Sequence, residues 1–242
     1  MATILVAGAT GKTGRRLVQR LLNRHHNVRV VVRSPDTLPV EIRESPNISV
    51  VIANILELSD DELSRHAIDC DAVVSCLGHV VSFKGMFGEP RRLCTDAARR
   101  LCRAIEKNNA AKPVKFILMS TVAVANPALH ETRTAFDRWF LAVLRHVLPP
   151  HRDNETAAEY LHRMGRRHEK LVEWCAVRPD SLIDAAEAPY DVEESPSTGI
   201  FAGRPTARSN VAHFMAELIE DAEIWTEWKF RMPVIMNAAS RV

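Results

Sequence analysis

The chain of 242 residues has little of several features that mark specialised proteins. Aromatic residues make up 6% of it, and 32 Lys and Arg against 30 Asp and Glu leave a net charge of +2. Binding of nucleic acid by phosphate neutralisation and base stacking needs more basic and aromatic residues, so we expect no nucleic-acid partner. No stretch approaches the ~20 apolar residues that span a bilayer, so we expect no membrane partner either.

Signals for secretion and for disulfide or metal stabilisation are equally scarce. The N-terminal MATILVAGATGKTG has no basic region, apolar core or cleavage site of a signal peptide. The five cysteines are odd in number and lack CxxC spacing, and the histidines show no metal-ligand spacing. We therefore expect a cytoplasmic protein with reduced thiols and no metal.

Strand-like and helix-like patterns alternate along the first half of a chain whose composition is ordinary for a globular protein. Continuous β-branched runs are typical of strands that are covered on both faces, as in a parallel sheet. The alternation predicts a doubly wound α/β sheet. We expect strands at residues 3–7, 28–32, 48–52, 71–77, 114–119 and 173–178, and helices at residues 13–23, 60–66 and 91–108.

The second half departs from this rhythm. Helices are predicted at residues 134–147 and 154–164, with Pro149 and Pro150 ending the first of them. Residues 180–207 are rich in Pro, Ser, Asp and Glu, which predicts a loop with one hairpin. Ser209 is predicted to cap a helix at residues 210–221, and residues 230–236 are predicted to form a last strand.

A glycine-rich turn follows the first strand and opens the first helix. Glycine permits a sharp turn and close approach to a pyrophosphate, and the helix N-terminus presents free N–H groups and a positive dipole end. Strand, turn, helix and second strand within 33 residues predict a dinucleotide site. The residues assigned to it are Gly8, Thr10, Gly11, Lys12, Thr13 and Gly14.

Two alternatives for this turn remain open. Gly11-Lys12-Thr13 matches the ending of a P-loop, but that motif needs a glycine five positions before Gly11, where the chain has Val6. The turn is also compatible with a tight strand-to-helix connection that binds no ligand.

Several segments resemble one protein family. The turn has the spacing GATGKTG in place of the GxGxxG of ordinary dehydrogenases, and it is joined by VVVRSPD, VVSCLG, FILMSTVAV and WCAVRPDSLID. Together these are similar to atypical short-chain dehydrogenase/reductases of the NmrA-like, biliverdin-reductase-B-like branch, over the chain to about residue 184. The resemblance implies a single Rossmann-type NAD(P)-binding domain over residues 1–242. Residues 1–150 would form its cofactor half and residues 151–242 a small, dependent, substrate-covering half.

The end of the second strand indicates which dinucleotide is bound. An acidic residue there would bind a ribose 2′-hydroxyl, whereas an arginine accommodates a 2′-phosphate. The chain has Arg33 and Ser34, with Arg15 as a further candidate, so we expect NADP(H) in preference to NAD(H).

The resemblance implies four further cofactor contacts. Asn54, which stands where the family commonly has an acidic residue, would approach the adenine through its amide. Ser75, Leu77 and Gly78 fall where the family runs its backbone beside the ribose.

The catalytic pattern departs from the family. Typical members use Tyr-x-x-x-Lys, in which the lysine lowers the pKa of the tyrosine. Here Tyr160 is followed four positions later by Met164, and Tyr190 by Glu194. Hydride transfer would then depend on positioning of the nicotinamide, with water or a hydroxyl supplying the proton.

The catalytic candidates are Ser120 and Thr121, which end the fifth strand where ligands bind in open α/β sheets. His79 is a candidate proton donor, with a surface histidine as the alternative. Tyr160 either lines the pocket or is a half-buried helix residue. Pro179 matches the family position beside the nicotinamide. The apolar segment at residues 134–147 would be a substrate wall, an oligomer contact or core.

The function predicted from these observations is NADPH-dependent reduction of a small conjugated or carbonyl acceptor, such as a quinone or flavin, by a monomer or homodimer. Two alternatives stay open. One is a non-catalytic NADP-binding redox sensor of the NmrA-like type, and the other is an epimerase or dehydratase with tightly held NADP.

Overall fold

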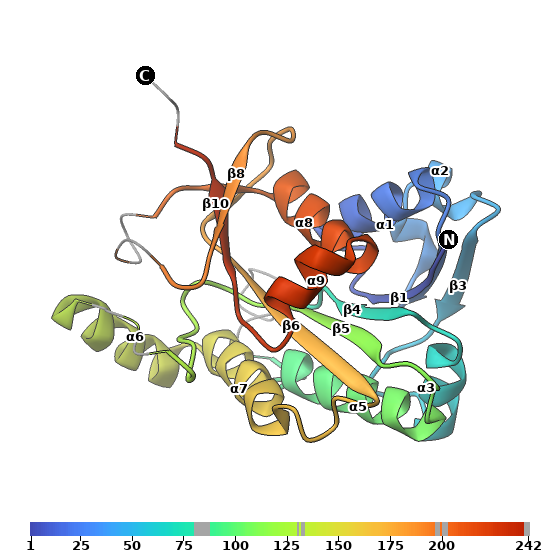
Figure 1. Cartoon of the computed structure of the whole chain (residues 1–242), viewed down its shortest axis with the longest axis horizontal. Coiled ribbons are helices and arrows are strands. Elements are labelled where there is room, and N and C mark those ends of the chain that lie inside the picture. Colours follow the sequence, from blue (N-terminus) through green and yellow to red (C-terminus); the bar gives the residue numbers. More distant parts are fainter. Residues whose placement is uncertain (80–87, 130, 132–133, 197–198, 200–202, 240–242) are drawn as a thin grey trace.

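One twisted sheet runs through the computed structural model, with helices on both of its faces (Figure 1). The model describes residues 1–79, 88–129, 131, 134–196, 199 and 203–239. The strand order is β3-β2-β1-β4-β5-β6-β10-β8, and β8 alone runs antiparallel to its neighbour. These strands are β1 (Thr3–Ala7), β2 (Asn27–Val32), β3 (Ile48–Ile52), β4 (Ala72–Ser75), β5 (Val114–Met119), β6 (Val172–Pro179), β8 (Tyr190–Glu193) and β10 (Val234–Asn237).

The predicted doubly wound Rossmann-type sheet is therefore confirmed. Strand order reverses between β1 and β4, and in such sheets ligands bind outside the carboxyl ends of the strands at this switch point. The sheet also takes β6, β8 and β10 from the second half of the chain, so both halves share it.

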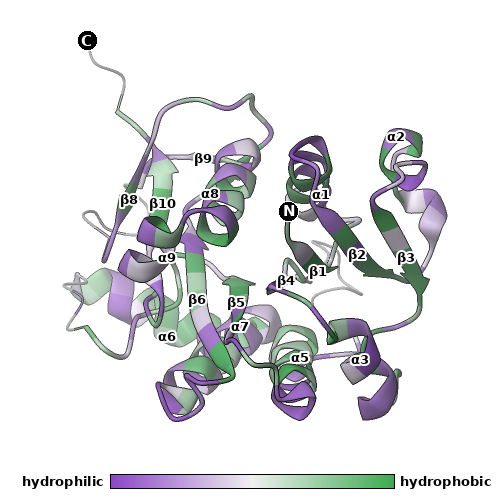
Figure 2. Cartoon of the chain, turned by 45° about the vertical axis from the view of Figure 1, so that its right-hand side comes forward, coloured by the Kyte–Doolittle hydropathy of each residue, from purple (hydrophilic) through white to green (hydrophobic). Residues whose placement is uncertain are grey.

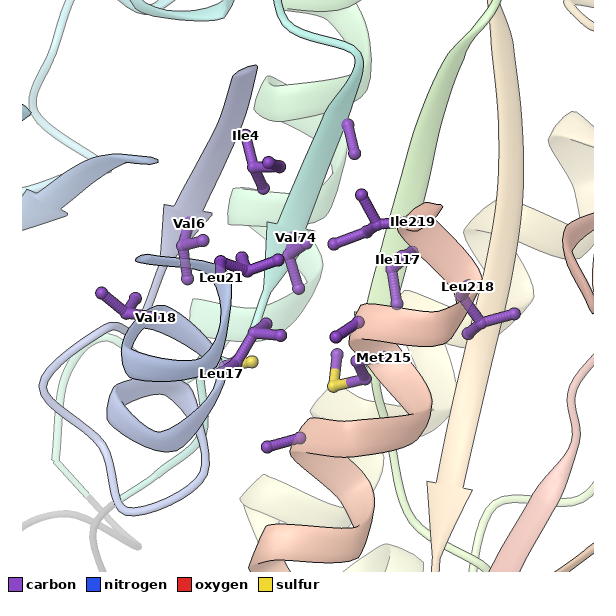
Figure 3. Packing of buried hydrophobic residues seen from close by; sticks show 14 of the residues in the cluster. Ile4, Val6, Leu17, Val18, Leu21, Val74, Ile117, Met215, Leu218 and Ile219 are labelled. Atoms are coloured by element: carbon purple, nitrogen blue, oxygen red, sulfur yellow. The ribbon is translucent and has the colours of Figure 1, made fainter. Parts of the chain in front are cut away.

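Helices α1 (Gly14–Asn23), α8 (Arg208–Glu220) and α9 (Ala222–Trp228) cover one face of the sheet. Leu17 and Leu21 of α1 meet Met215 and Leu218 of α8 over Val74 of β4 (Figure 3). The apolar side of α1 is buried because its leucines recur at helical spacing. The short η1 (Pro35–Thr37) and α2 (Val40–Arg43) close this side near β3.

Helices α3 (Asp60–Ala67), α5 (Leu93–Asn108) and α7 (Pro149–Met164) cover the opposite face, with α6 (Ala135–Val147) beside α7 at one end of the molecule (Figure 1). Leu63, Leu101 and Leu161 bring one helix each to this second core. Figure 2 shows hydrophobic colour along the central strands and hydrophilic colour on the outward sides of the helices. None of the helices in the described ranges has the length and apolarity needed to cross a bilayer.

Three local expectations were wrong. Helix α6 ends before Pro149 as expected, but the next helix, α7, begins at Pro149 and not at residue 154, because the N–H that proline lacks would be unpaired in the first helical turn anyway. Ser209 does not cap α8, since Ala207 stands at the cap position and the Ser209 hydroxyl donates to the Ala185 carbonyl. The expected hairpin at residues 180–207 is absent from the described part of that segment.

The strands of that segment pair with partners other than each other. β7 (Leu182–Ile183) pairs in parallel with β9 (Thr206–Ala207), and β8 pairs with β10. Helices α2 and α9 were not expected at all. Each is short, with four and seven residues, so neither offers the repeated apolar spacing that predicts a helix.

Candidate functional site

The three glycines of the first turn meet different constraints. Gly8 has φ +82°, and a Cβ there would lie 2.6 Å from the Cys76 carbonyl carbon, so the turns after β1 and β4 touch. A Cβ on Gly14 would lie 2.2 Å from the Gly8 oxygen. Gly11 is exposed, has no positive φ, and would bring a Cβ no closer than 3.2 Å to the Gly8 oxygen. Gly8 and Gly14 are thus required by packing, whereas Gly11 leaves an opening.

The N-terminus of α1 lies beside this opening. Thr13 stands at its cap position, buried and in helical conformation, and no side chain caps the helix. Thr10 is exposed in the same turn. An uncapped helix end beside a side-chain-free backbone fits the pyrophosphate of a dinucleotide.

Lys12 already has a partner. Its Nζ lies 2.6 Å from Oδ2 of Asp184, which also pairs with Arg16 and Arg208. Hydrogen bonding from Lys12 holds the pKa of Asp184 below its usual range. The Lys12 ammonium, which the sequence assigned to the cofactor site, is therefore ion-paired with a carboxylate of the segment after β7.

Two arginines, Arg33 after β2 and Arg15 at the start of α1, have no carboxylate partner among the described residues. Arg33 is exposed, and no ion pair or side-chain hydrogen bond of Arg33 or Arg15 occurs in the described part of the chain. Asp36 lies close by in sequence, but its Oδ1 faces Arg43 Nη1 at 3.4 Å. Ser34 is half-buried, and its carbonyl accepts from the Thr37 hydroxyl. This arrangement fits a 2′-phosphate better than a free 2′-hydroxyl.

Asn54 differs from its expected role. Its Oδ1 accepts from the Leu56 N–H at 3.2 Å, and its Nδ2 donates to Glu57 Oε1 at 2.8 Å. Both ends of the amide thus stabilise the turn after β3. An adenine contact from Asn54 would have to share or replace these bonds.

The turn after β4 lies at the switch point. Ser75 is fully buried beside Ala7 of β1, and its Oγ has no hydrogen-bond partner in the part of the chain that the structure describes. Leu77 is half-buried, and Gly78 is exposed with open space where a Cβ would be. Backbone that is free of side chains therefore stands at Gly78 as well as at Gly11, which fits a cofactor lying across the strand ends.

His79 is drawn into a buried cluster instead of standing on the surface. Its Nε2 lies 2.8 Å from Oδ2 of Asp153, and its side chain is 6% exposed. Asp153, on α7, also accepts from the N–H groups of Cys94 and Thr95 and from the Thr95 hydroxyl. Asp153 therefore caps α5 from a different helix.

Sequence reasoning missed Asp153, because nothing local signals a contact across 58 residues. The ligand atoms of His79, Cys94 and Asp153 lie within 4.8 Å of one another, the spacing of a metal site. However, both carboxylate oxygens are already hydrogen-bonded, and burial raises the pKa of Cys94 well above its usual value. The cluster is explained by helix capping.

A cavity of about 350 Å³ opens at the carboxyl ends of β5 and β6. Ser120, Thr121 and Pro179 line one side, and Phe140, Leu141 and Leu144 of α6 line the other. The Ser120 hydroxyl is buried and has no hydrogen-bond partner within the described ranges, whereas Thr121 Oγ1 accepts from the Ala123 N–H at 3.4 Å. The two catalytic candidates Ser120 and Thr121 thus meet Pro179, the residue expected beside the nicotinamide, in one cavity with an apolar wall.

Both tyrosines lie outside the lining of this cavity. Tyr160 packs between α7 and α5, with the Arg99 guanidinium 5.6 Å from its ring centre, and burial raises its pKa. Tyr190 bonds to His213 Nδ1 at 3.0 Å, and burial raises its pKa to about 12. Neither phenol is acidified, so neither resembles the tyrosine of a Tyr-x-x-x-Lys pair.

Arg178, which directly precedes the cavity residue Pro179, holds together several segments of the chain next to the cavity. It is fully buried, pairs with Glu131 at 2.6 Å, and donates to the carbonyls of Val124, Met232 and Glu194. Buried guanidinium groups need this many partners to offset lost hydration. The arginine ties the segment after β5 to β6, β8 and β10, and it directly precedes the proline of the cavity wall.

The comparison with protein families agrees with this geometry. Residues 8–222 match the model of a family described as NAD(P)H-binding. The chain belongs to the NAD(P)H-binding family. The resemblance that the glycine turn and strand ends indicated is thereby confirmed.

One curated relative of this NAD(P)H-binding protein is an uncharacterized chloroplastic protein of Arabidopsis thaliana. It is 29% identical over 126 residues, which cover 52% of this chain and 43% of the relative. The match thus spans less than half the length of that relative.

Solved structures share the fold. A short-chain dehydrogenase/reductase from Veillonella parvula in complex with NADP has a TM-score of 0.70 at 15% identity, over 100% of this chain and 97% of that one. A putative NADH-flavin reductase from Streptococcus pneumoniae scores 0.66 at 15% identity, over 98% and 100%. An anaerobillin reductase from Escherichia coli O157:H7 scores 0.69 at 15% identity, over 99% of each chain.

Proposed function

We propose that this chain is an NADPH-dependent reductase of a small conjugated or carbonyl acceptor. The observation that carries the proposal is the cavity at the ends of β5 and β6, which Ser120 lines together with an apolar wall from α6, and the buried Ser120 hydroxyl has no hydrogen-bond partner among the described residues. Two proteins of similar structure are named as a putative NADH-flavin reductase and an anaerobillin reductase, and these names support a conjugated acceptor.

Each residue of the acceptor cavity has a separate role in the proposed reaction. When bound, the nicotinamide supplies the hydride. The Ser120 hydroxyl, which has no other partner, donates a hydrogen bond to the oxygen or nitrogen that gains charge on the acceptor. Thr121 lies next to it and orients the same group, while Phe140 and Leu144 give the acceptor ring an apolar surface. Water or a hydroxyl supplies the proton, because neither tyrosine is among the described residues that line the cavity.

The preference for NADPH is part of the proposal. Exposed Arg33 and Arg15 offer guanidinium donors at the end of β2 and the start of α1, and the nearby Asp36 is paired with Arg43. A bidentate guanidinium–phosphate pair is the common means of recognising a 2′-phosphate.

A single-turnover experiment tests the proposed function. The protein is mixed with NADPH and with a panel of quinones, flavins, enones and aldehydes, while the absorbance of the reduced nicotinamide is followed. We expect rapid oxidation with at least one conjugated acceptor. Tight binding of NADPH without turnover on any member of the panel would overturn the reductase and favour a redox sensor.

A further inference from the structure

A second cavity, lined largely by arginines, lies at the junction of three helices. Its volume is about 560 Å³. Arg91 and Arg92 come from the segment that leads into α5, Arg145 from the end of α6, and Arg152 from the first turns of α7. His146, Pro149, Asp153 and Thr156 complete the lining. We call this cavity the arginine cleft.

The charges of the arginine cleft are only partly neutralised. Arg91, Arg92 and Arg145 each face one carboxylate, at 3.4, 3.8 and 3.3 Å respectively, and all three side chains are more than half exposed. Arg152 is exposed, and its side chain has no hydrogen bond or ion pair among the described residues. Ion pairs whose arginine is mostly exposed contribute little to stability, so these arginines are able to take another anion as partner.

The backbone N–H groups at the N-terminus of α5 are not the source of the positive charge in the arginine cleft. The N–H groups of Cys94 and Thr95 are already bonded to Asp153, which is the only carboxylate among the described residues of the lining. Four guanidinium groups on three elements therefore make the site. Guanidinium groups offer paired donors that match the oxygens of carboxylate and phosphate.

Helix α6 connects the arginine cleft with the acceptor cavity. Leu141 lines the acceptor cavity, and Arg145, four residues further on, lines the cleft. Residues at this spacing share one side of a helix, with Cβ atoms roughly 6 Å apart. The two linings are thus separated by about one helical turn.

We propose that the arginine cleft binds a carboxylate or phosphate group carried by the acceptor. The acceptor is then a planar conjugated molecule with an anionic arm, its ring in the apolar cavity and its arm among the arginines. This inference rests on the proposed function, because it assigns the ring to the acceptor cavity.

Two matched pairs of flavins test it. FMN and riboflavin differ by a phosphate, and 10-carboxymethylflavin and lumiflavin differ by a carboxylate on the same ring. We measure kcat and KM for each with NADPH, and separately measure equilibrium binding to the NADP⁺-saturated protein by quenching of flavin fluorescence. Loss of affinity on removal of the phosphate, the carboxylate or both identifies which anion the cleft prefers.

The variant Arg152→Gln removes a guanidinium that has no partner among the described residues, and Arg145→Gln removes the one on α6, the helix that also lines the acceptor cavity. Each should weaken binding of the anionic flavin and raise its KM about 5–30-fold, with little effect on the neutral flavin. Arg163→Gln is the matched control, because Arg163 is an exposed, ion-paired residue of α7 outside the cleft.

The outcomes separate this inference from the proposed function. Tighter binding of anionic flavins that Arg152→Gln abolishes supports the cleft even when no flavin is turned over. Equal binding of the charged and neutral members of both pairs overturns it even when both are reduced. Equal losses in Arg163→Gln and Arg152→Gln overturn it as well, because general surface charge would then account for the effect.

Discussion

At the residue scale, the three glycines of the first turn have different roles. Two of them are required by packing, and we expect the third to matter for ligand binding. Cβ atoms on Gly8 and Gly14 would collide with backbone, but a Cβ on Gly11 would meet only the Gly8 oxygen at 3.2 Å. The conformation of Gly11 is also open to any residue. Sequence alone marks all three glycines as a cofactor motif, whereas packing in the structure requires Gly8 and Gly14 and leaves Gly11 exposed, so we propose that Gly11 faces the cofactor.

We expect Gly11→Val to abolish NADPH binding while the protein stays folded. The valine side chain would occupy the opening next to the uncapped end of α1. Calorimetry measures the binding, and circular dichroism with thermal melting measures folding. Gly14→Val is the contrasting control and should fail to fold, because its Cβ lies 2.2 Å from the Gly8 oxygen. Micromolar binding retained in folded Gly11→Val would show that the turn is only structural.

Arg33 carries the second prediction at this scale. Arg33→Ala should weaken NADP(H) binding by about 1.5–3 kcal/mol, or ~10–150-fold, and leave NAD(H) binding nearly unchanged. The reason is that, in the proposed binding mode, the lost guanidinium contacts only the 2′-phosphate. Titration calorimetry with both cofactors at two salt concentrations provides the measurement. An unchanged ratio of the two affinities contradicts the assignment.

Ser120 carries the third prediction. Ser120→Ala should lower kcat about 10–1,000-fold, the range for loss of one donor to a developing charge, with cofactor affinity intact. Thr121→Ala should have a smaller effect in the same direction, since its hydroxyl also accepts from Ala123. Tyr160→Phe serves as the control, because Tyr160 lies between α5 and α7. A collapse of kcat in Tyr160→Phe would mean that another group activates that tyrosine.

At the element scale, the first turn of α5 depends on a residue of α7. Asp153 accepts both backbone N–H groups at the start of α5 and holds His79 after β4. One carboxylate therefore fixes three elements at the edge of the sheet where the site is formed. No single element would place these groups together.

Asp153→Ala should lower the free energy of unfolding by about 2–4 kcal/mol, because two buried N–H groups lose their acceptor. Urea denaturation measures the change. Asp96→Asn is the matched control on α5, since Asp96 is half-exposed and faces Arg92 at 3.8 Å. If the two variants were equally stable, the buried cap would have no special role.

Element boundaries were predicted well where the signal is local. The strand at residues 114–119 and the strand at residues 48–52 were found with the expected bounds, because short β-branched runs are visible in sequence. The start of α7 was missed, since proline reads equally as a helix end and a helix beginning. The pairing of β8 with β10 was missed because it joins segments more than 40 residues apart, for which no local pattern exists.

At the scale of the whole molecule, burial of the cysteine thiols should make the free energy of unfolding fall as the pH becomes alkaline. All five thiols are buried, and burial raises their pKa values, to about 11 for Cys70 and about 12 for Cys76. The unfolded thiols titrate near pH 8.5, so above that pH the unfolded chain loses protons that the folded chain keeps. The stabilisation is complete below the unfolded pKa and falls as pH rises.

Each thiol should therefore cost about 1.4 kcal/mol of stability per pH unit above its unfolded pKa. Urea denaturation between pH 7 and 9.5 measures this slope. Burial also raises the pKa of the fully buried Cys175 thiol. Cys175→Ala removes this thiol and should therefore reduce the slope of stability against pH by the contribution of one titrating group. A stability that does not change over this range would contradict the burial of the thiols.

The sequence by itself determined the alternation of strands and helices, the glycine turn and the absence of a Tyr-x-x-x-Lys pair. These are properties of neighbouring residues, because backbone hydrogen bonding and apolar spacing act over a few positions. Tertiary structure alone decided that Lys12 pairs with Asp184 across 172 residues, that Asp153 caps α5, and that α6 walls the cavity beside Ser120. Such contacts depend on how whole elements pack on the sheet, and the side chains involved carry no local mark of their partners.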